Sequence, residues 1–169
     1  MSNIATFKNA LRSPARSTLF RVQLQFPDGN NELDSYLCKG AQVPSVDIGP
    51  IEASFMGRKA KYAGDKTYPE WTVTMYNDNN FSLRNKFELW IEKINTTEGN
   101  VSAIDWSDYQ FDQLVHHLDG QKNIIKTYKM IRAWPSALDP IELSWEDNDA
   151  IEEFTVTFTY DEWTTETTS

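Results

Sequence analysis

The chain has 169 residues, of which 40% are hydrophobic and 24% are charged, as expected for a globular protein that buries a core. Its net charge of −9 disfavours a nucleic-acid-binding protein, because phosphate contacts need clustered Lys and Arg. A single cysteine excludes an intramolecular disulfide, and no apolar run is long enough for a signal peptide or a membrane helix, so we expect a soluble protein made in a cytoplasm.

The first part of the chain combines a polar arm with two predicted strands. An arm is expected over residues 1–17, in which Phe7–Leu11 can form a short helix that Pro14 ends. From residue 20 to 26 the even-numbered positions are apolar and the odd-numbered positions polar, which predicts a strand with one buried face. A second strand, with less regular alternation, is predicted over residues 36–43.

The middle of the chain predicts two strands between loops, followed by one helix. Residues 51–55 and 71–75 alternate in the same way, whereas 44–50 and 56–69 contain Pro, Gly and polar residues and are expected to be loops. The helix is predicted over 80–95, because apolar residues recur there at helical spacing. These residues are Leu83, Phe87, Trp90, Ile91 and Ile94.

The predicted helix has candidate boundary residues at both ends. Asn79 or Asn80 is the expected N-cap, and Gly99 lies beyond the C-terminal end.

The last part of the chain predicts a hairpin and two more strands. Residues 111–118 and 122–134 are strand-like runs separated by Asp119-Gly120, a pair that favours a tight turn. Residues 141–145 and 154–160 again alternate with period two.

These elements predict a mainly β fold with one flanking α-helix. Strands with one apolar face each favour antiparallel sheets in a β-sandwich or a barrel-like arrangement. We expect a single domain over residues 1–169, with a loop at 96–110 and a flexible polar tail at 164–169.

The sequence contains no residue set that predicts catalysis or metal binding. His116 and His117 are the only histidines and, as neighbours on a strand, point to opposite faces, so they cannot hold one metal ion together. Cys38 is the only thiol, and neither a nucleophile turn nor a nucleotide-binding glycine pattern occurs. We therefore expect no catalytic residue, no metal and no cofactor.

Charge is segregated between two segments. Residues 56–66 are basic, whereas 139–153 contain seven acids and neither Lys nor Arg. Two ordinary solvated loops would explain this bias. The alternative is a head-to-tail contact between copies of the chain, because complementary patches fix register and a heterologous contact builds rings or filaments. The candidate contact residues are Arg58, Lys59, Lys61, Asp65, Glu146, Asp147 and Asp149.

Threonines form the polar face of two predicted strands. They are Thr72, Thr74, Thr155, Thr157 and Thr159. Plain solvent exposure would explain them, since Thr suits strands. However, strand 154–160 contains neither Lys nor Pro, the residues that usually protect an exposed edge. This strand is therefore a candidate for pairing between subunits. In a ring of such subunits, the threonine face is a candidate lining of the central lumen.

Two long blocks of the sequence resemble one known family. The first is Phe55–Asp78, FMGRKAKYAGDKTYPEWTVTMYND, which leads into the helix LRNKFELW. The second is Ala133–Trp163, AWPSALDPIELSWEDNDAIEEFTVTFTYDEW. In this order, and with LFRVQLQF and YLCKGAQVP before them, they resemble the tail tube proteins of T-even-type contractile-tailed bacteriophages. The resemblance is weakest over residues 96–121.

The resemblance implies a structural virion protein, made in the bacterial cytoplasm. Family members share their fold with type VI secretion tubes and form sixfold rings, which stack into a hollow tube inside a contractile sheath and conduct DNA during ejection. By position, Arg58, Lys59, Lys61 and Asp65 would lie in a long loop between rings.

The resemblance also implies a set of partners and leaves alternatives. The partners are further copies of the chain, the sheath protein, the baseplate and tail terminator proteins, and the tape-measure protein and DNA in the lumen, held without sequence-specific contacts and without a membrane anchor. A baseplate tube initiator or a secretion-system tube protein has the same fold. From another class, abundant carboxylates leave a small β-domain hydrolase open.

Overall fold

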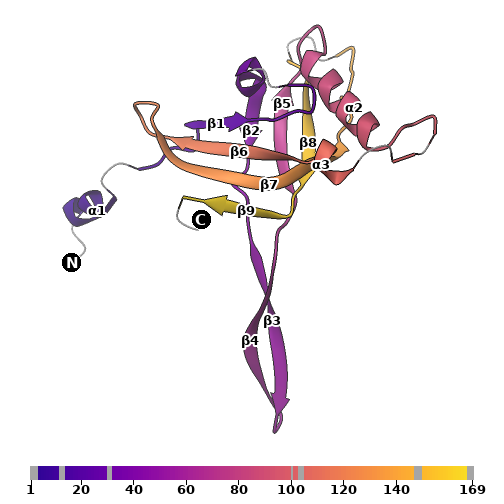
Figure 1. Ribbon diagram of the computed structural model, residues 1–169. Helices are drawn as coiled ribbons and strands as arrows, with labels where there is room; N and C mark the ends of the chain where they lie inside the picture. The colour runs from indigo at the N-terminus through magenta and orange to yellow at the C-terminus, as the bar shows by residue number, and fades with distance from the viewer. Residues whose placement is uncertain are drawn as a thin grey trace.

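The computed structural model describes residues 4–11, 14–29, 32–99, 101–102, 105–146 and 150–166. It shows a body of antiparallel strands covered by a helix, with a long hairpin arm and a short N-terminal helix projecting from it (Figure 1). The predicted class, mainly antiparallel β with a flanking helix, is confirmed.

Seven of the strands in the described part of the chain form the sheet of the body. Its order is β1-β6-β7-β8-β5-β2, and β9 pairs with β7 beside this path. The strands are β1 (Phe20–Gln23), β2 (Cys38–Ala41), β5 (Trp71–Tyr76), β6 (Phe111–Leu118), β7 (Ile124–Leu138), β8 (Glu153–Thr159) and β9 (Glu162–Thr165).

The 15-residue strand β7 joins the two halves of this sheet. Its first part pairs with β6 and β9, and residues 134–138 pair with β8. Between the two parts Arg132 adopts a left-handed conformation, with φ of 56°. Its amide donates to Asp112 Oδ1 at 3.0 Å, and its guanidinium pairs with Asp161 at 2.5 Å. This bulge bends β7 from one half of the sheet to the other.

Helix α2 (Ser82–Ile94) closes the core as its apolar stripe predicts. Leu83, Phe87 and Trp90 are fully buried. The Phe87 ring lies 5.0 Å from that of Phe26 and 6.0 Å from that of Phe158, in edge-on contacts typical of aromatic cores.

The start of α2 differs from the sequence prediction. Neither Asn79 nor Asn80 caps the helix, because Phe81 takes the N-cap position in a left-handed conformation. The Asp78 carboxylate instead accepts hydrogen bonds from the amide and the hydroxyl of Ser82, both at 2.8 Å. These bonds lower the pKa of Asp78.

The predicted strands and turns of the body largely match the structure. Strands β5 and β8 bury alternate residues, and β1, although shorter than expected, buries the predicted face. Asp119 organises the β6–β7 hairpin by accepting hydrogen bonds from the amides of Gln121 and Asn123, both at 2.8 Å. Of the strand predicted at 36–43, Cys38–Ala41 form β2, whereas residues 36–37 belong to the 3₁₀ helix η1 (Glu32–Leu37).

Three segments differ more clearly from expectation. Residues 141–145 do not form a strand. The β7–β8 register ends before them, at Leu138 and Val156, and one further hydrogen bond joins Asp139 N to Thr155 O at 2.9 Å. Within the 96–110 loop, Trp106–Tyr109 form helix α3. Thr164 and Thr165 pair in β9, so the sheet extends into the segment expected to be a tail.

The hairpin arm consists of β3 (Asp47–Phe55) and β4 (Arg58–Thr67). The expected loops at 44–50 and 56–69 are therefore largely strand. Met56 and Gly57 form the turn, with φ of 47° and 77°, as a tight hairpin requires. All nine residues of β3 are exposed, so the predicted buried face of 51–55 is wrong within one protomer. The arm projects from the body, and none of the other described elements forms a second layer over it (Figure 1).

Helix α1 (Ile4–Leu11) confirms the expected N-terminal helix. It lies away from the body of the protein (Figure 1).

Candidate assembly surfaces

The hairpin arm presents one apolar face and one charged face. Ile51 opposes Tyr62 and Phe55 opposes Arg58, and opposed residues in a ladder share a face. Ile51, Phe55, Tyr62 and the turn residue Met56 form the apolar face of the arm, and Arg58 lies on this same face beside the turn. Phe55 is 70% exposed and Met56 88%. An apolar strip this exposed on a two-stranded hairpin is typical of a contact surface.

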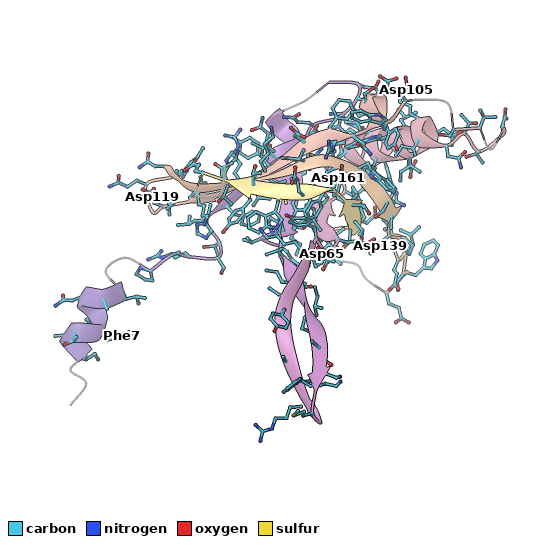
Figure 2. All side chains as sticks on the ribbon, turned by 60° about the horizontal axis from the view of Figure 1, so that its bottom comes forward. Phe7, Asp65, Asp105, Asp119, Asp139 and Asp161 are labelled. Atoms are coloured by element: carbon cyan, nitrogen blue, oxygen red, sulfur yellow. The ribbon has the colours of Figure 1, made fainter. Side chains whose placement is uncertain are left out.

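The charged face of the arm neutralises part of its own charge. Glu52 accepts from Lys59 at 2.6 Å and lies 3.9 Å from Lys61. Two of the predicted contact cations are thus paired within the arm. Arg58 lies beside the turn, whereas Asp65 lies near the body, so the structure separates these two candidates (Figure 2).

The base of the arm depends on a glycine pair that the sequence analysis did not single out. The ladder shifts register between Ile48 and Pro50. A Cβ at Gly64 would lie 2.6 Å from the carbonyl oxygen of Gly49, which is closer than side chains tolerate. The sequence signal for this pair was the presence of glycines in a segment whose flanking residues are strand-like.

The structure gathers the five predicted threonines on one surface. Thr72 opposes Thr157 and Thr74 opposes Thr155, with the last two hydroxyls 3.3 Å apart. Thr159 continues the row on β8, and all five are half-buried. We call this surface the threonine face. It is the face of β5 and β8 opposite the core residues of these strands.

The prediction that strand 154–160 is an unprotected edge is wrong. Strand β8 lies between β5 and β7, and both of its ladders are filled within the protomer. It lacks Lys and Pro because it is internal. In the described part of the chain, the half of the sheet that contains β6 ends at the outer sides of β1 and β9. The half that contains β8 ends at the outer sides of β2 and of residues 134–138.

Each of the two free edges in the half that contains β8 carries a residue that discourages unspecific pairing. Strand β2 contains Lys39, which pairs with Glu153 of β8. The free segment of β7 contains Pro135, which lacks an amide proton.

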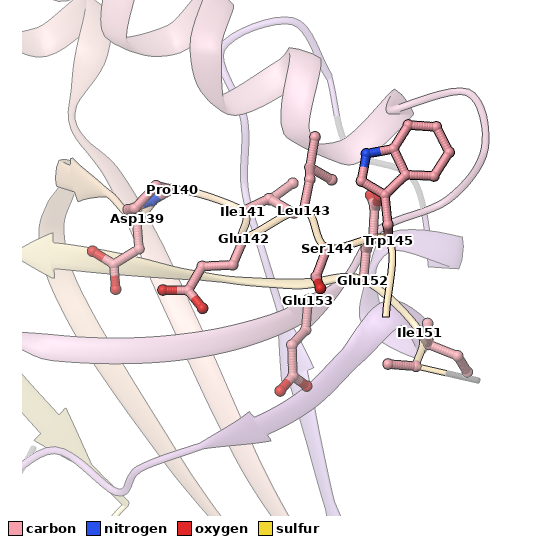
Figure 3. Close-up of a pocket in the computed structure, with 11 residues that line it drawn as sticks. Asp139, Pro140, Ile141, Glu142, Leu143, Ser144, Trp145, Ile151, Glu152 and Glu153 are labelled. Atoms are coloured by element: carbon pink, nitrogen blue, oxygen red, sulfur yellow. The ribbon is translucent and has the colours of Figure 1, made fainter. Parts of the chain in front are cut away.

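In the acidic segment, residues 139–153, the described residues 139–145 and 150–153 line an open hollow of about 790 Å³. Among the candidates Glu146 is exposed, and Asp147 and Asp149 lie outside the described residues. The segment also displays large apolar side chains, which the sequence analysis assigned to a strand. Leu143 is 79% exposed and Trp145 fully exposed (Figure 3).

Neither histidine nor the cysteine has the setting of a reactive group. His116 Nδ1 lies 2.9 Å from Thr127 Oγ1, and burial, aided by the charge of Arg21, lowers its pKa. Burial raises the pKa of the Cys38 thiol to about 12, so it stays protonated at neutral pH. Across the described ranges no group of three or more His, Cys, Asp or Glu could hold a metal ion. None of the described helices has the length and apolar character to cross a bilayer.

The described residues thus form an antiparallel sheet with free edges and an exposed two-faced arm. The chain belongs to the phage tail tube protein family, whose model matches residues 14–166. The predicted resemblance is confirmed, and with it the expectation of a structural virion protein of a contractile phage-like system and not an enzyme.

Two curated relatives cover nearly the whole chain. The tail tube protein gp19 of Enterobacteria phage T4 is 30% identical over 151 residues, which are 88% of this chain and 90% of that protein. The tail tube protein of Serratia phage KSP90 is 26% identical over 168 residues, 95% of each chain.

A solved structure shows the same fold. A chain from the sheath-tube complex of the extracellular contractile injection system PVC, in its extended state, superposes with a TM-score of 0.70 at 14% identity. The match covers 98% of this chain and 99% of that one.

Proposed function

We propose that copies of this chain close into sixfold rings and that the rings stack into the hollow tube of a contractile phage tail. The sixfold ring is what resemblance to the family implies. The observation that carries the proposal is the part of the sheet formed by β2, β5, β8 and residues 134–138, which has a free edge at each end. Unpaired strand edges are templates for another strand.

Ring closure follows from joining these edges. The edge of β2 from one copy would pair with the free segment of β7 from the next. Such pairing is heterologous, because two different surfaces meet, and it closes when the rotation between copies completes a circle. A closed ring of strands leaves no edge exposed.

The threonine face supports a role as the lining of the lumen. Its hydroxyls are polar but uncharged, so they hydrate a channel without holding a polyanion by ion pairs. The net charge of −9 of each chain also repels a polyanion such as DNA. DNA and the tape-measure protein would therefore occupy the lumen without sequence-specific contacts.

The hairpin arm supports a role between rings. It is too thin to be stable as a free structure and has an apolar face that only another molecule can bury. Packing against the next ring would bury Phe55, Met56 and Tyr62, with Arg58, Lys59, Lys61 and Asp65 at or near this contact. The outer surface of the tube would meet the sheath, as in the PVC complex, and its ends the baseplate and tail terminator proteins.

Electron microscopy of the purified, concentrated protein, alongside a sizing column, tests the proposal. Hollow tubes or sixfold rings are the expected result, with isolated baseplates added as nuclei where the protein alone stays monomeric. A chain that forms single rings and never tubes under either condition would instead favour a tube initiator. A strict monomer in both conditions would overturn the proposal.

A further inference from the structure

Helix α1 is an amphipathic helix whose apolar side is not buried by any of the described residues of the protomer. Ile4, Phe7 and Leu11 recur at helical spacing and are all exposed, and Phe7 is 64% accessible. None of the eight residues of the helix is buried. A helix this short is marginal in water without a partner.

The N-terminal arm and the acidic segment have complementary charge. Residues 1–18 contain Lys8, Arg12 and Arg16 and no acid, whereas residues 139–153 contain seven acids and neither Lys nor Arg. The hairpin arm is a weaker match for the acidic segment. Residues 47–67 contain four cations and three acids, and Glu52 already pairs with Lys59.

The acidic segment also offers an apolar surface of suitable kind. Leu143, Trp145 and Ile151 are exposed around the hollow (Figure 3). Glu142 lies among them, as do Glu152 and Glu153, which also accept hydrogen bonds from Asn77 and Lys39. An apolar centre with a charged rim is the usual composition of a contact between proteins. A basic helix with an apolar stripe matches both parts of it.

The two surfaces lie on opposite sides of the body. Figure 2 shows Phe7 far to one side and Asp139 at the other. A contact between them therefore joins two copies of the chain, head to tail, as a ring or a stack requires.

We propose that α1 of one copy packs its apolar stripe on Leu143, Trp145 and Ile151 of a neighbouring copy, with the cations of the arm beside the acidic rim. This inference rests on the proposed self-assembly. It makes the N-terminal arm a strap between subunits and replaces the basic hairpin as the partner of the acidic segment.

Disulfide trapping in the full chain tests this contact. Phe7→Cys and Leu143→Cys are made as separate variants, both with Cys38→Ala, and one of them carries a tag that shifts its band on a gel. The two proteins are mixed, assembled and mildly oxidised. We expect about tenfold more mixed dimer than from Phe7→Cys mixed with Gln121→Cys, because docking raises the effective concentration of the paired thiols.

Electron microscopy of the same samples separates two failures. Tubes or rings without mixed dimer above the Gln121→Cys control would overturn the strap and leave the proposed function intact. Absence of any assembly from unmodified protein would overturn the proposed function, and the strap with it.

Discussion

Phe87 shows how much one side chain contributes to this fold. It is fully buried, and its ring contacts those of Phe26, Trp90, Phe154 and Phe158. Phe87→Ala should lower the free energy of unfolding by about 3–5 kcal/mol, because it removes these contacts and leaves a cavity. Urea denaturation measures the loss. The matched control is Leu89→Ala on the exposed side of α2, which should change stability by less than about 0.5 kcal/mol, and an equal loss for both would contradict this account.

Asp78 makes stability sensitive to acid at the start of α2. Hydrogen bonds from Ser82 hold its pKa below the ordinary value of 3.8. A carboxylate with a lowered folded-state pKa stabilises the fold above its ordinary pKa, and this contribution is lost as pH falls through the folded-state value. Melting temperatures measured from mildly acidic pH to below 3.8 should therefore fall less steeply for Asp78→Asn than for the unmodified chain. Parallel curves would show that the cap does not contribute.

At the scale of elements, the base of the hairpin arm depends on Gly64. A methyl group there would collide with the carbonyl oxygen of Gly49, at 2.6 Å. Gly64→Ala should open the arm, at a local cost of about 1–3 kcal/mol, while the melting temperature of the body stays unchanged. Hydrogen exchange of β3 and β4 amides reports the opening. Gly40→Ala, where a Cβ meets nothing within 4 Å, is the control and should leave the arm protected.

The two faces of the arm should differ in their effect on assembly. Phe55→Ser removes a side chain from the apolar face and should shorten or abolish tubes while rings persist. Lys59→Ser changes the charged face of the arm and should shorten the tubes much less. Both residues are exposed, so neither change should alter the melting temperature of the isolated chain. Tube lengths in electron micrographs decide the matter, and tubes of normal length from Phe55→Ser would exclude the apolar face as the contact.

The elements that the sequence predicts best are those whose buried face is covered by the same chain. In α2, β5 and β8 the local period and the tertiary burial agree, and Asp119-Gly120 turns the chain as its residue types predict. In the hairpin arm, the local period and the burial within the protomer disagree. Residues 51–55 alternate like a half-buried strand, but periodicity cannot tell which molecule buries the apolar side.

At the scale of the whole molecule, strand order decides what Thr157 can do. The internal position of β8 means that Thr157→Lys leaves both of its ladders intact, and the long lysine can extend its amine from the threonine face. We expect rings and tubes to persist in this variant, with a melting temperature close to that of the unmodified chain. Electron microscopy and thermal unfolding check this. Loss of rings would mean that the threonine face is itself buried between subunits.

The order of the strands in the sheet could not be predicted from the sequence. The absence of Lys and Pro in 154–160 fits an internal strand as well as an unprotected edge, and only long-range pairing distinguishes them. The five threonines were predicted as a set and do lie together, since β5 and β8 are antiparallel neighbours in one sheet and their register puts the threonines on the same face. The free edges of β2 and of residues 134–138 could not be predicted, because an edge is defined by what lies beside it.

Lys39 and Pro135, on those two edges, would affect when subunits assemble. A proline and a charged side chain make an edge slow to accept a stray strand without making it unable to accept the right one. If rings close through these edges, a newly made subunit would persist alone until a growing tube end holds it in register. The rate of tube growth would then be set by the number of growing tube ends. Unassembled subunits could accumulate in large excess without forming premature polymers.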